Sequence, residues 1–301
     1  MTTSSKPRFD VHEAITNQII AAIEAGTGKL QMPWHRSGAN VMRPVNVASG
    51  NGYRGINTVA LWAVADTFGY EHGLWGTYRQ WQDRGAQVRK GEKSSLIVFY
   101  REFNQDDDDD RDDNDRRRRC MARASRVFNI SQVDGYVLDE PTTDDNRVDP
   151  IGSAEAFVDA TGAKISEGGD RAFYSIREDA ITMPDRYRFI DTKTGTATEG
   201  YYATLLHELT HWTGPSHRLD RQFGERFGDD AYAIEELVAE LGAAFLCGDL
   251  SISAEPRADH AAYIDSWLTV LKNDKRAIFA AAAQAERAAQ YLRDPAKAAL
   301  S

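Results

Sequence analysis

Hydrophobic positions recur at helical spacing near the start of the chain. Val11, Ile15, Ile19 and Ile23 follow one another every four residues, which places their side chains on one face of a helix. Asp10 precedes them and is a good N-cap, because its carboxylate can accept hydrogen bonds from the first free N–H groups. The pattern therefore predicts an amphipathic helix over residues 9–25.

Helical patterns then give way to strand patterns. Two short helices are predicted at 58–68 and 78–84. Stretches rich in β-branched and aromatic residues predict strands at 87–90, 94–103 and 125–133. We expect the last two strands to pair as a hairpin, with the residues between them as a long insertion.

The second half of the chain is dominated by helical periodicity. The segment 171–184 is an exception, because its pattern predicts strand structure. We expect its end, DAITMP (179–184), to form an edge strand that could pair with an extended peptide through backbone hydrogen bonds. Helices are predicted at about 153–160, 199–213, 229–248, 258–272 and 275–293.

Composition divides these elements into two domains. The chain has 301 residues, enough for two domains of ordinary size. The polar segment 138–150 predicts a linker between a domain at 1–137 and a domain at 151–301. An insertion at about 105–120 consists almost wholly of aspartate and arginine and is expected to be disordered. The predicted fold class is α+β, with a small α+β N-terminal domain and a mostly helical C-terminal domain.

Charge is distributed unevenly along the chain. The net charge is −10, yet residues 1–104 carry 12 basic against 8 acidic side chains. A basic third in an acidic protein is typical of a segment that meets nucleic acid. Cys120 and Cys247 are the only cysteines, so no disulfide framework is expected. The sequence shows neither a membrane-spanning run nor a secretory signal, and we expect a cytoplasmic protein without a membrane partner.

The strongest chemical signal is the run His-Glu-Leu-Thr-His at 207–211. Two histidines four residues apart lie on one face of a helix, where His207 and His211 can bind the same metal ion. Glu208 lies beside them, where it could act as the general base toward a metal-bound water. The motif predicts a metallopeptidase-like site that holds Zn²⁺, with Mn²⁺ as the second candidate.

A mononuclear zinc site needs a third protein ligand, and the sequence offers two main candidates. His217 completes the pattern HExxHxxGxxH, but no methionine follows Met183, so the methionine turn that accompanies that pattern is missing. Glu236 lies in an apolar stretch and is favoured, with Glu235 as a lesser competitor. Glu240 shares a helical face with Glu236 and is expected to accept the outer N–H of a ligand histidine.

The basic N-terminal third also concentrates aromatic residues. Aromatic rings stack on unpaired bases while cations follow the phosphates, so the combination is typical of single-stranded nucleic-acid binding. The same rings could equally fill a small core, and residue types alone do not decide between the two. The residues concerned are Trp34, Tyr53, Trp75, Tyr78 and Trp81, interleaved with Arg43, Arg54, Arg79, Arg89, Lys90 and Lys93.

Motifs along nearly the whole chain resemble one protein family, the ArdC-type antirestriction proteins. Its N-terminal domain, which also begins certain plasmid-borne primases, is similar to PW (33–34), RPVN (43–46), YRGIN (53–57), TYRQW (77–81), GAQVRKGEKS (85–94) and VFNISQVDG (127–135). Its zincin-like C-terminal domain is similar to YYATLLHELTHWTG (201–214), RLDR (218–221) and EELVAELGAAFLC (235–247).

The resemblance implies a domain that binds single-stranded DNA without sequence preference, joined to a gluzincin-type metalloprotease fold. The family is carried on conjugative plasmids and shields incoming DNA from host restriction endonucleases. By position, the resemblance implies metal binding by His207, His211 and Glu236, with Glu208 as the base. Residue types and resemblance together indicate a set of DNA-binding residues: Trp34, Arg43, Asn46, Tyr53, Arg54, Asn57, Tyr78, Arg89, Lys90 and Lys93.

Two other functions stay open at this point. One is a DNA-activated metalloprotease that cleaves DNA-bound or crosslinked proteins, resembling the SprT-like group, which would add a protein substrate as a partner. The other is a pure binding protein whose metal is structural. Replacing Glu208 with glutamine separates them, because only a protease needs the general base.

Overall fold

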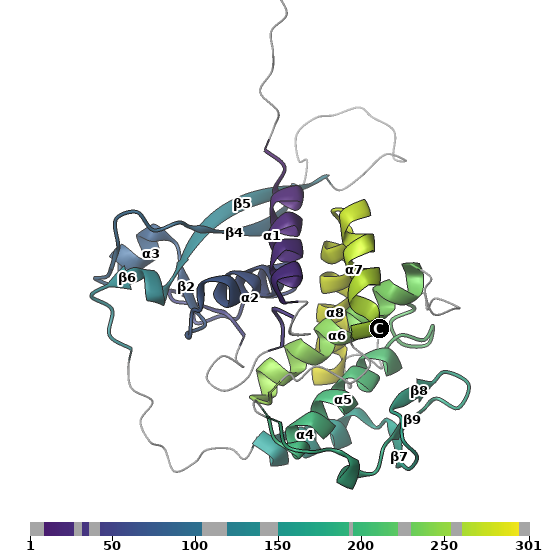
Figure 1. Ribbon diagram of the computed structural model, residues 1–301. Coiled ribbons are helices and arrows are strands. Elements are labelled where there is room, and N and C mark those ends of the chain that lie inside the picture. The colour runs from purple at the N-terminus through teal and green to yellow at the C-terminus, as the bar shows by residue number, and fades with distance from the viewer. Residues whose placement is uncertain are drawn as a thin grey trace, which may run out of the picture.

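The computed structural model describes residues 9–26, 32–35, 43–103, 119–138, 150–192, 195–221, 230–253 and 261–294 (Figure 1). Most of the predicted Asp/Arg insertion and of the predicted linker therefore lies outside the described residues. Within the described parts, the chain mixes helices and small sheets, which confirms the predicted α+β class. Among these residues, no helix is both long enough and apolar enough to cross a membrane.

The N-terminal half consists of helices packed against a small sheet. Helix α1 spans Val11–Gly26, and Oδ1 of Asp10 accepts hydrogen bonds from the N–H groups of His12 and Glu13, as predicted for an N-cap. Helix α2 begins at Ile56, two residues before the predicted start, and ends at Phe68. The four-stranded sheet has the order β1-β2-β5-β4, with β1 at Val45–Asn46, β2 at Leu74–Gly76, β4 at Ser95–Phe103 and β5 at Arg119–Asn129.

The predicted hairpin is confirmed. β5 pairs antiparallel with β4 along the whole length of β4, from Ser95 opposite Val127 to Phe103 opposite Arg119. A second small layer lies beside this sheet and is built from short elements. It contains α3 (Tyr78–Gln82), whose N-cap Thr77 forms a capping box with Gln80, and the strand pair β3 (Gln87–Val88) and β6 (Val133–Asp134).

The C-terminal half opens with helix α4 (Pro150–Thr161) and a three-stranded sheet. Its strands are β7 (Lys164–Glu167), β8 (Phe173–Ser175) and β9 (Ala180–Met183), in the order β7-β9-β8. The prediction that DAITMP forms an edge strand is therefore wrong. β9 is the central strand because the polar stretch KISE, which gave no strand pattern, pairs with it in parallel. The edges belong to β7 and β8.

Four helices complete the fold, each close to its predicted position. They are α5 (Ala197–Trp212), α6 (Asp230–Leu250), α7 (Ala261–Asn273) and α8 (Ala277–Arg293). Helix α5 starts at a capping box formed by Thr196 and Glu199, which satisfies two of its free N–H groups. Oε1 of Glu199 also accepts from the N–H and hydroxyl groups of Ser253, and this contact ties the start of α5 to the segment that follows α6.

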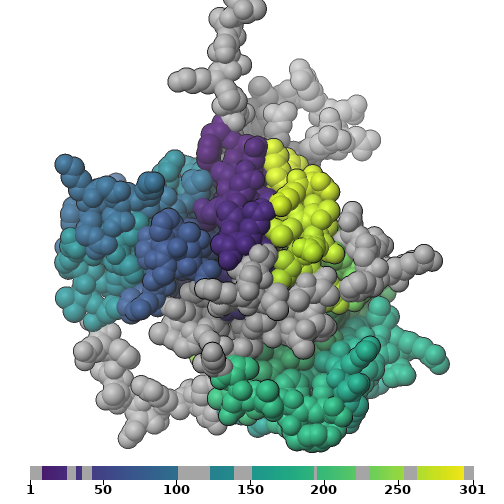
Figure 2. Space-filling model, in the orientation of Figure 1, coloured from purple at the N-terminus to yellow at the C-terminus, as the bar shows by residue number. Residues whose placement is uncertain are grey.

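The main hydrophobic core is shared by both halves of the chain. One continuous cluster runs from Ile15 and Ile19 in α1, through Trp62 in α2, to Leu206 in α5 and Leu237 in α6. Figure 1 shows α1 beside α7, and Figure 2 shows their side chains in contact at the surface. Two smaller clusters, around Trp75 and around Trp81, lie within the N-terminal half alone.

Candidate metal centre and nucleic-acid surface

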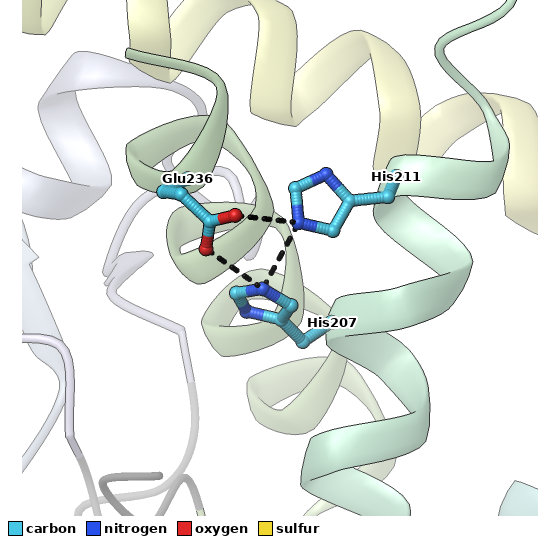
Figure 3. Close-up of side chains that lie close together, drawn as sticks. All are labelled: His207, His211 and Glu236. Atoms are coloured by element: carbon cyan, nitrogen blue, oxygen red, sulfur yellow. Dashed lines mark hydrogen bonds and ion pairs between the residues drawn. The ribbon is translucent and has the colours of Figure 1, made fainter. Parts of the chain in front are cut away.

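Two consecutive helices bring the predicted metal ligands together. Helix α5 places His207 and His211 one turn apart, and α6 runs beside it with Glu236 facing both (Figure 3). The helices approach closely at Gly242, where an added Cβ atom would lie 2.6 Å from Cγ2 of Thr210. Because Thr210 lies between the two histidines and is buried, a glycine at this point sets the spacing of the site.

The three side chains converge on one point. Nε2 of His207 lies 3.1 Å from Nε2 of His211, and the carboxylate oxygens of Glu236 lie 3.5 Å from each of these nitrogens (Figure 3). Ligand atoms bound at about 2.1 Å from one tetrahedral ion are about 3.4 Å from each other. The spacing therefore fits a single divalent cation. Among the described residues, this is the one group of His, Cys, Asp or Glu side chains with metal-binding spacing.

Carboxylates face the outer nitrogens of both histidines. Nδ1 of His211 lies 3.1 Å from Oε1 of Glu235, and Nδ1 of His207 lies 3.4 Å from Oε2 of Glu240. A carboxylate accepts hydrogen bonds and donates none, so this arrangement favours imidazoles that carry hydrogen on Nδ1. Both Nε2 atoms then direct lone pairs at the same point, which is repulsive unless a cation lies between them.

Glu235 contacts the outer nitrogen of His211 and is itself held by Arg221. Nε and Nη2 of Arg221 donate to its two carboxylate oxygens at 3.0 and 2.9 Å, and the same guanidinium donates to the carbonyl oxygen of Thr210 at 2.6 Å. Burial alone would raise the pKa of Glu235, but the hydrogen bonds with His211 and Arg221 lower it below its ordinary value. Glu235 thus stays ionised and holds His211 in place.

The other two predicted residues of the motif occupy different environments. Glu208 follows His207 on α5 and is buried, with 3% of its surface exposed. The side chain of His217 is 58% exposed, and its Nε2 accepts from Nη1 of Arg218 and lies 3.6 Å from Oδ2 of Asp179. His217 is therefore outside the cluster, and its match to the longer histidine pattern does not produce a ligand.

Comparison with known proteins shows which families the two halves of the chain resemble. Residues 9–128 match the family described as the N-terminal domain of anti-restriction factor ArdC, and residues 152–284 match a family of zincin-like metallopeptidases. The crystal structure of the antirestriction ArdC protein from the R388 plasmid, in metal-free form, has 38% identity and a TM-score of 0.74, with 96% of this chain and 98% of that chain covered. The chain belongs to the ArdC antirestriction family.

Further relatives extend this family assignment. The Mn(II)-bound structure of R388 ArdC is 39% identical, with a TM-score of 0.73 and coverage of 95% of this chain and 98% of that one. A protein of Sinorhizobium fredii, described as uncharacterized protein y4eC, is 46% identical over 97% of this chain and 95% of its own length. Two DNA primases of Escherichia coli, both TraC, are 35% identical, but this chain spans 20% and 27% of their length. A zincin-like fold implies a divalent metal.

In this ArdC-family chain, three of the predicted DNA-binding residues lie in the interior. Trp34 is fully buried against Trp267, with ring centroids 6.2 Å apart. Arg43 is also buried. Its Nη1 donates to a carboxylate oxygen of Glu286 at 2.7 Å, and its Nε donates to the carbonyl oxygen of Phe245. Tyr53 is also buried. The prediction that Trp34, Arg43 and Tyr53 contact DNA is therefore corrected, because all three side chains are buried. The residue types suit a nucleic-acid surface, but Trp34 and Arg43 join the N-terminal half to the C-terminal half.

Two predicted asparagines use their amides inside the protein. Asn57 accepts from the N–H group of Val98 and donates to its carbonyl oxygen, both at 2.8 Å, which joins α2 to β4. Oδ1 of Asn46 accepts from the N–H groups of Ala48 and Ser49, while its Nδ2 donates to the hydroxyl group of Tyr53. Their place in the family motifs is explained by these structural contacts.

Five predicted residues remain at the surface of the N-terminal half. Arg54, Lys90 and Lys93 are exposed, and Tyr78 is 44% exposed. Arg89 is exposed as well, but it is 3.0 Å from Glu92, and the hydrogen bonds to Glu92 and Asp134 raise its pKa. The positive charge that this surface offers to a ligand therefore comes mainly from Arg54, Lys90 and Lys93.

Sequence reasoning missed two groups of residues. The half-exposed ring of Phe99 on β4 lies directly opposite the exposed Arg123 on β5, an aromatic–cation pair on an open sheet face. The signal was present in LIVFYREF (96–103), but the sequence analysis predicted only a strand there. His35 was missed too: its Nε2 lies 2.6 Å from Oε1 of Glu240, and no local pattern links residues 205 positions apart.

Proposed function

We propose that this protein binds single-stranded DNA without sequence specificity and protects incoming plasmid DNA from host restriction endonucleases in the cytoplasm. One observation carries the proposal: the near-full-length match to a solved antirestriction ArdC protein. The exposed cations Arg54, Lys90 and Lys93, with Tyr78 and Phe99 as exposed rings, are the chemistry that unpaired nucleotides need.

The C-terminal half is proposed to hold one Zn²⁺, with Mn²⁺ as the alternative, through His207, His211 and Glu236. The donor set of two imidazoles and one carboxylate suits either ion. When bound, such an ion polarises a carbonyl group and lowers the pKa of a bound water. Glu208 is the residue that would take the proton, and Glu235 and Glu240 orient the two imidazoles through Nδ1.

A restriction-protection assay tests the proposal. Cells that express the wild-type protein, Glu208→Gln, or an Arg54→Ser and Lys90→Ser double variant receive an unmodified plasmid by conjugation, and surviving transconjugants are counted. If DNA coating carries protection, Glu208→Gln protects as well as wild type and the double variant protects much less. Oligonucleotide binding by the purified proteins should follow the same order and weaken with salt.

Two results would contradict this assignment. Loss of protection in Glu208→Gln, with DNA and metal binding intact, would instead indicate a metalloprotease that acts on a protein substrate. Full protection by a double variant that no longer binds single strands would show that DNA coating is not the basis of the effect.

A further inference from the structure

The N-terminal half reaches into the metal centre through one short segment. Residues 32–35 are buried, and their chain lies among the C-terminal helices. Trp34 packs against Trp267 of α7, whose own indole N–H donates to the carbonyl oxygen of Ala233 on α6. The next residue, His35, is also buried, and its ring faces the helix that carries Glu236. A residue of the N-terminal half therefore lies one carboxylate, that of Glu240, away from the candidate metal ligand His207.

The tautomer of His35 is fixed by its neighbours. Nδ1 accepts a hydrogen bond of 3.0 Å from the backbone N–H of Met32, so this nitrogen carries the lone pair. Nε2 therefore carries the hydrogen and donates to Oε1 of Glu240 over 2.6 Å. The other oxygen of Glu240 lies 3.4 Å from Nδ1 of His207. His35, Glu240 and His207 thus form a chain in which each group has one defined role.

Glu240 needs such a donor because it is buried. A carboxylate shielded from water is costly unless hydrogen bonds or opposite charges compensate it. His211 has an equivalent support, but there the buried Arg221 holds Glu235 from within the C-terminal half. At Glu240, by contrast, a donor comes from the N-terminal half, namely Nε2 of His35.

We propose that His35 is a positioning residue of the metal centre: it holds Glu240, which in turn orients His207, so that the N-terminal half completes the site. The inference deepens the proposed function and rests on its metal site. Partners of ligand histidines typically change metal affinity by about 10- to 100-fold when removed. The N-terminal half also contacts α6 about two and a half turns beyond Glu240, where Nε of Arg43 lies 2.9 Å from Oδ1 of Asp249.

Two substitutions at one position separate this role from packing. In His35→Gln the side-chain amide can reach the place of Nε2 and donate to Glu240. In His35→Asn the shorter side chain places its oxygen near Nδ1, where it can accept from Met32 but leaves Glu240 without the donor. Both replace the ring by an amide, so any effect of losing the ring on packing is common to both.

The experiment titrates metal-free full-length proteins with Zn²⁺ and Mn²⁺ by calorimetry and records the visible spectrum after loading with Co²⁺. We expect about 10- to 100-fold weaker binding and an altered Co²⁺ spectrum in His35→Asn. His35→Gln should bind close to wild type and keep its spectrum.

The outcomes distinguish two kinds of failure. Wild-type affinity and spectrum in both variants would overturn the role of His35 while leaving the metal site standing. Equal weakening in both variants would also overturn it, because loss of the ring would then explain the effect. A wild-type protein that binds none of these ions would overturn the metal site itself, and this inference with it.

Discussion

The metal centre and the nucleic-acid surface are built on different principles. The candidate metal ligands come from two adjacent helices, and a further carboxylate faces the outer nitrogen of each of the two histidines. The exposed candidate DNA-binding residues lie on short elements and on the turns between them. Geometry therefore defines the first site closely, whereas composition and charge define the second. A single substitution should damage the metal centre severely, while the DNA surface should lose affinity in small steps.

The largest effect is expected from removing one ligand. Glu236→Ala leaves two imidazoles, and affinity for Zn²⁺ or Mn²⁺ should fall by more than about 100-fold, since changes to supporting residues alone reach that size. DNA affinity should not change. Calorimetry and fluorescence anisotropy with a labelled oligonucleotide measure the two quantities.

His217→Ala is the matched control for this loss, because His217 is the other ligand candidate and the structure places it at the surface. Its metal affinity should equal that of wild type. A large loss in His217→Ala, with little change in Glu236→Ala, would reverse the ligand assignment.

A middle-sized effect is expected where the two ligand-bearing helices touch. Gly242→Ala places a methyl group against Thr210, and overpacking of this kind costs about 1–3 kcal/mol of folding free energy. The forced separation of α5 and α6 should also weaken metal binding. Urea denaturation and metal titration measure the two effects.

Gly200→Ala, on helix α5, serves as the control, because an added Cβ there would lie at an ordinary 3.7 Å from Cδ1 of Phe189. It should leave metal binding unchanged and stabilise the protein by up to about 1 kcal/mol. If Gly242→Ala likewise leaves stability and metal binding undiminished, the close contact between α5 and α6 does not determine the geometry of the metal site.

The smallest effect concerns Arg43, which was predicted to contact DNA and instead joins the two halves. Burial acts to raise the pKa of Glu286, but the charge and hydrogen bond of Arg43 lower it below its ordinary value. Because the pKa of Glu286 is lower in the folded state, its ionised carboxylate stabilises the fold at pH values above the unfolded pKa of about 4.3. This stabilisation is lost as the pH falls through the folded-state pKa.

Glu286→Gln should therefore reduce the acid sensitivity of stability below about pH 5, by up to about 1.4 kcal/mol per pH unit. Denaturation curves at pH 7, 5, 4 and 3 measure this slope. An unchanged slope would mean that the pKa of Glu286 does not differ between the folded and unfolded states.

The sequence predicted the centre better than its surroundings. The spacing of His207 and His211 fixes their relation on one helix, and the four-residue step from Glu236 to Glu240 puts both acids on the face toward them. No local rule could decide which of the neighbours Glu235 and Glu236 binds the ion, because that depends on the packing of α6 against α5. Trp34 is buried because it packs against Trp267, more than two hundred residues away in the sequence. Composition carries no information about such a contact, so the prediction that Trp34 contacts DNA was wrong.

The shared hydrophobic core has a consequence for how such a chain can be recombined. Helices α1 and α2 bury their apolar faces against α7 and α8. If the chain were divided within 139–149, each of the two separated halves would expose a large hydrophobic surface. If one half were replaced by the corresponding half of a distant relative, matching substitutions would be needed on both sides of the contact between the halves. Inheritance as an undivided block is the simpler route, and it agrees with the TraC primases, whose similarity extends across nearly all of this chain.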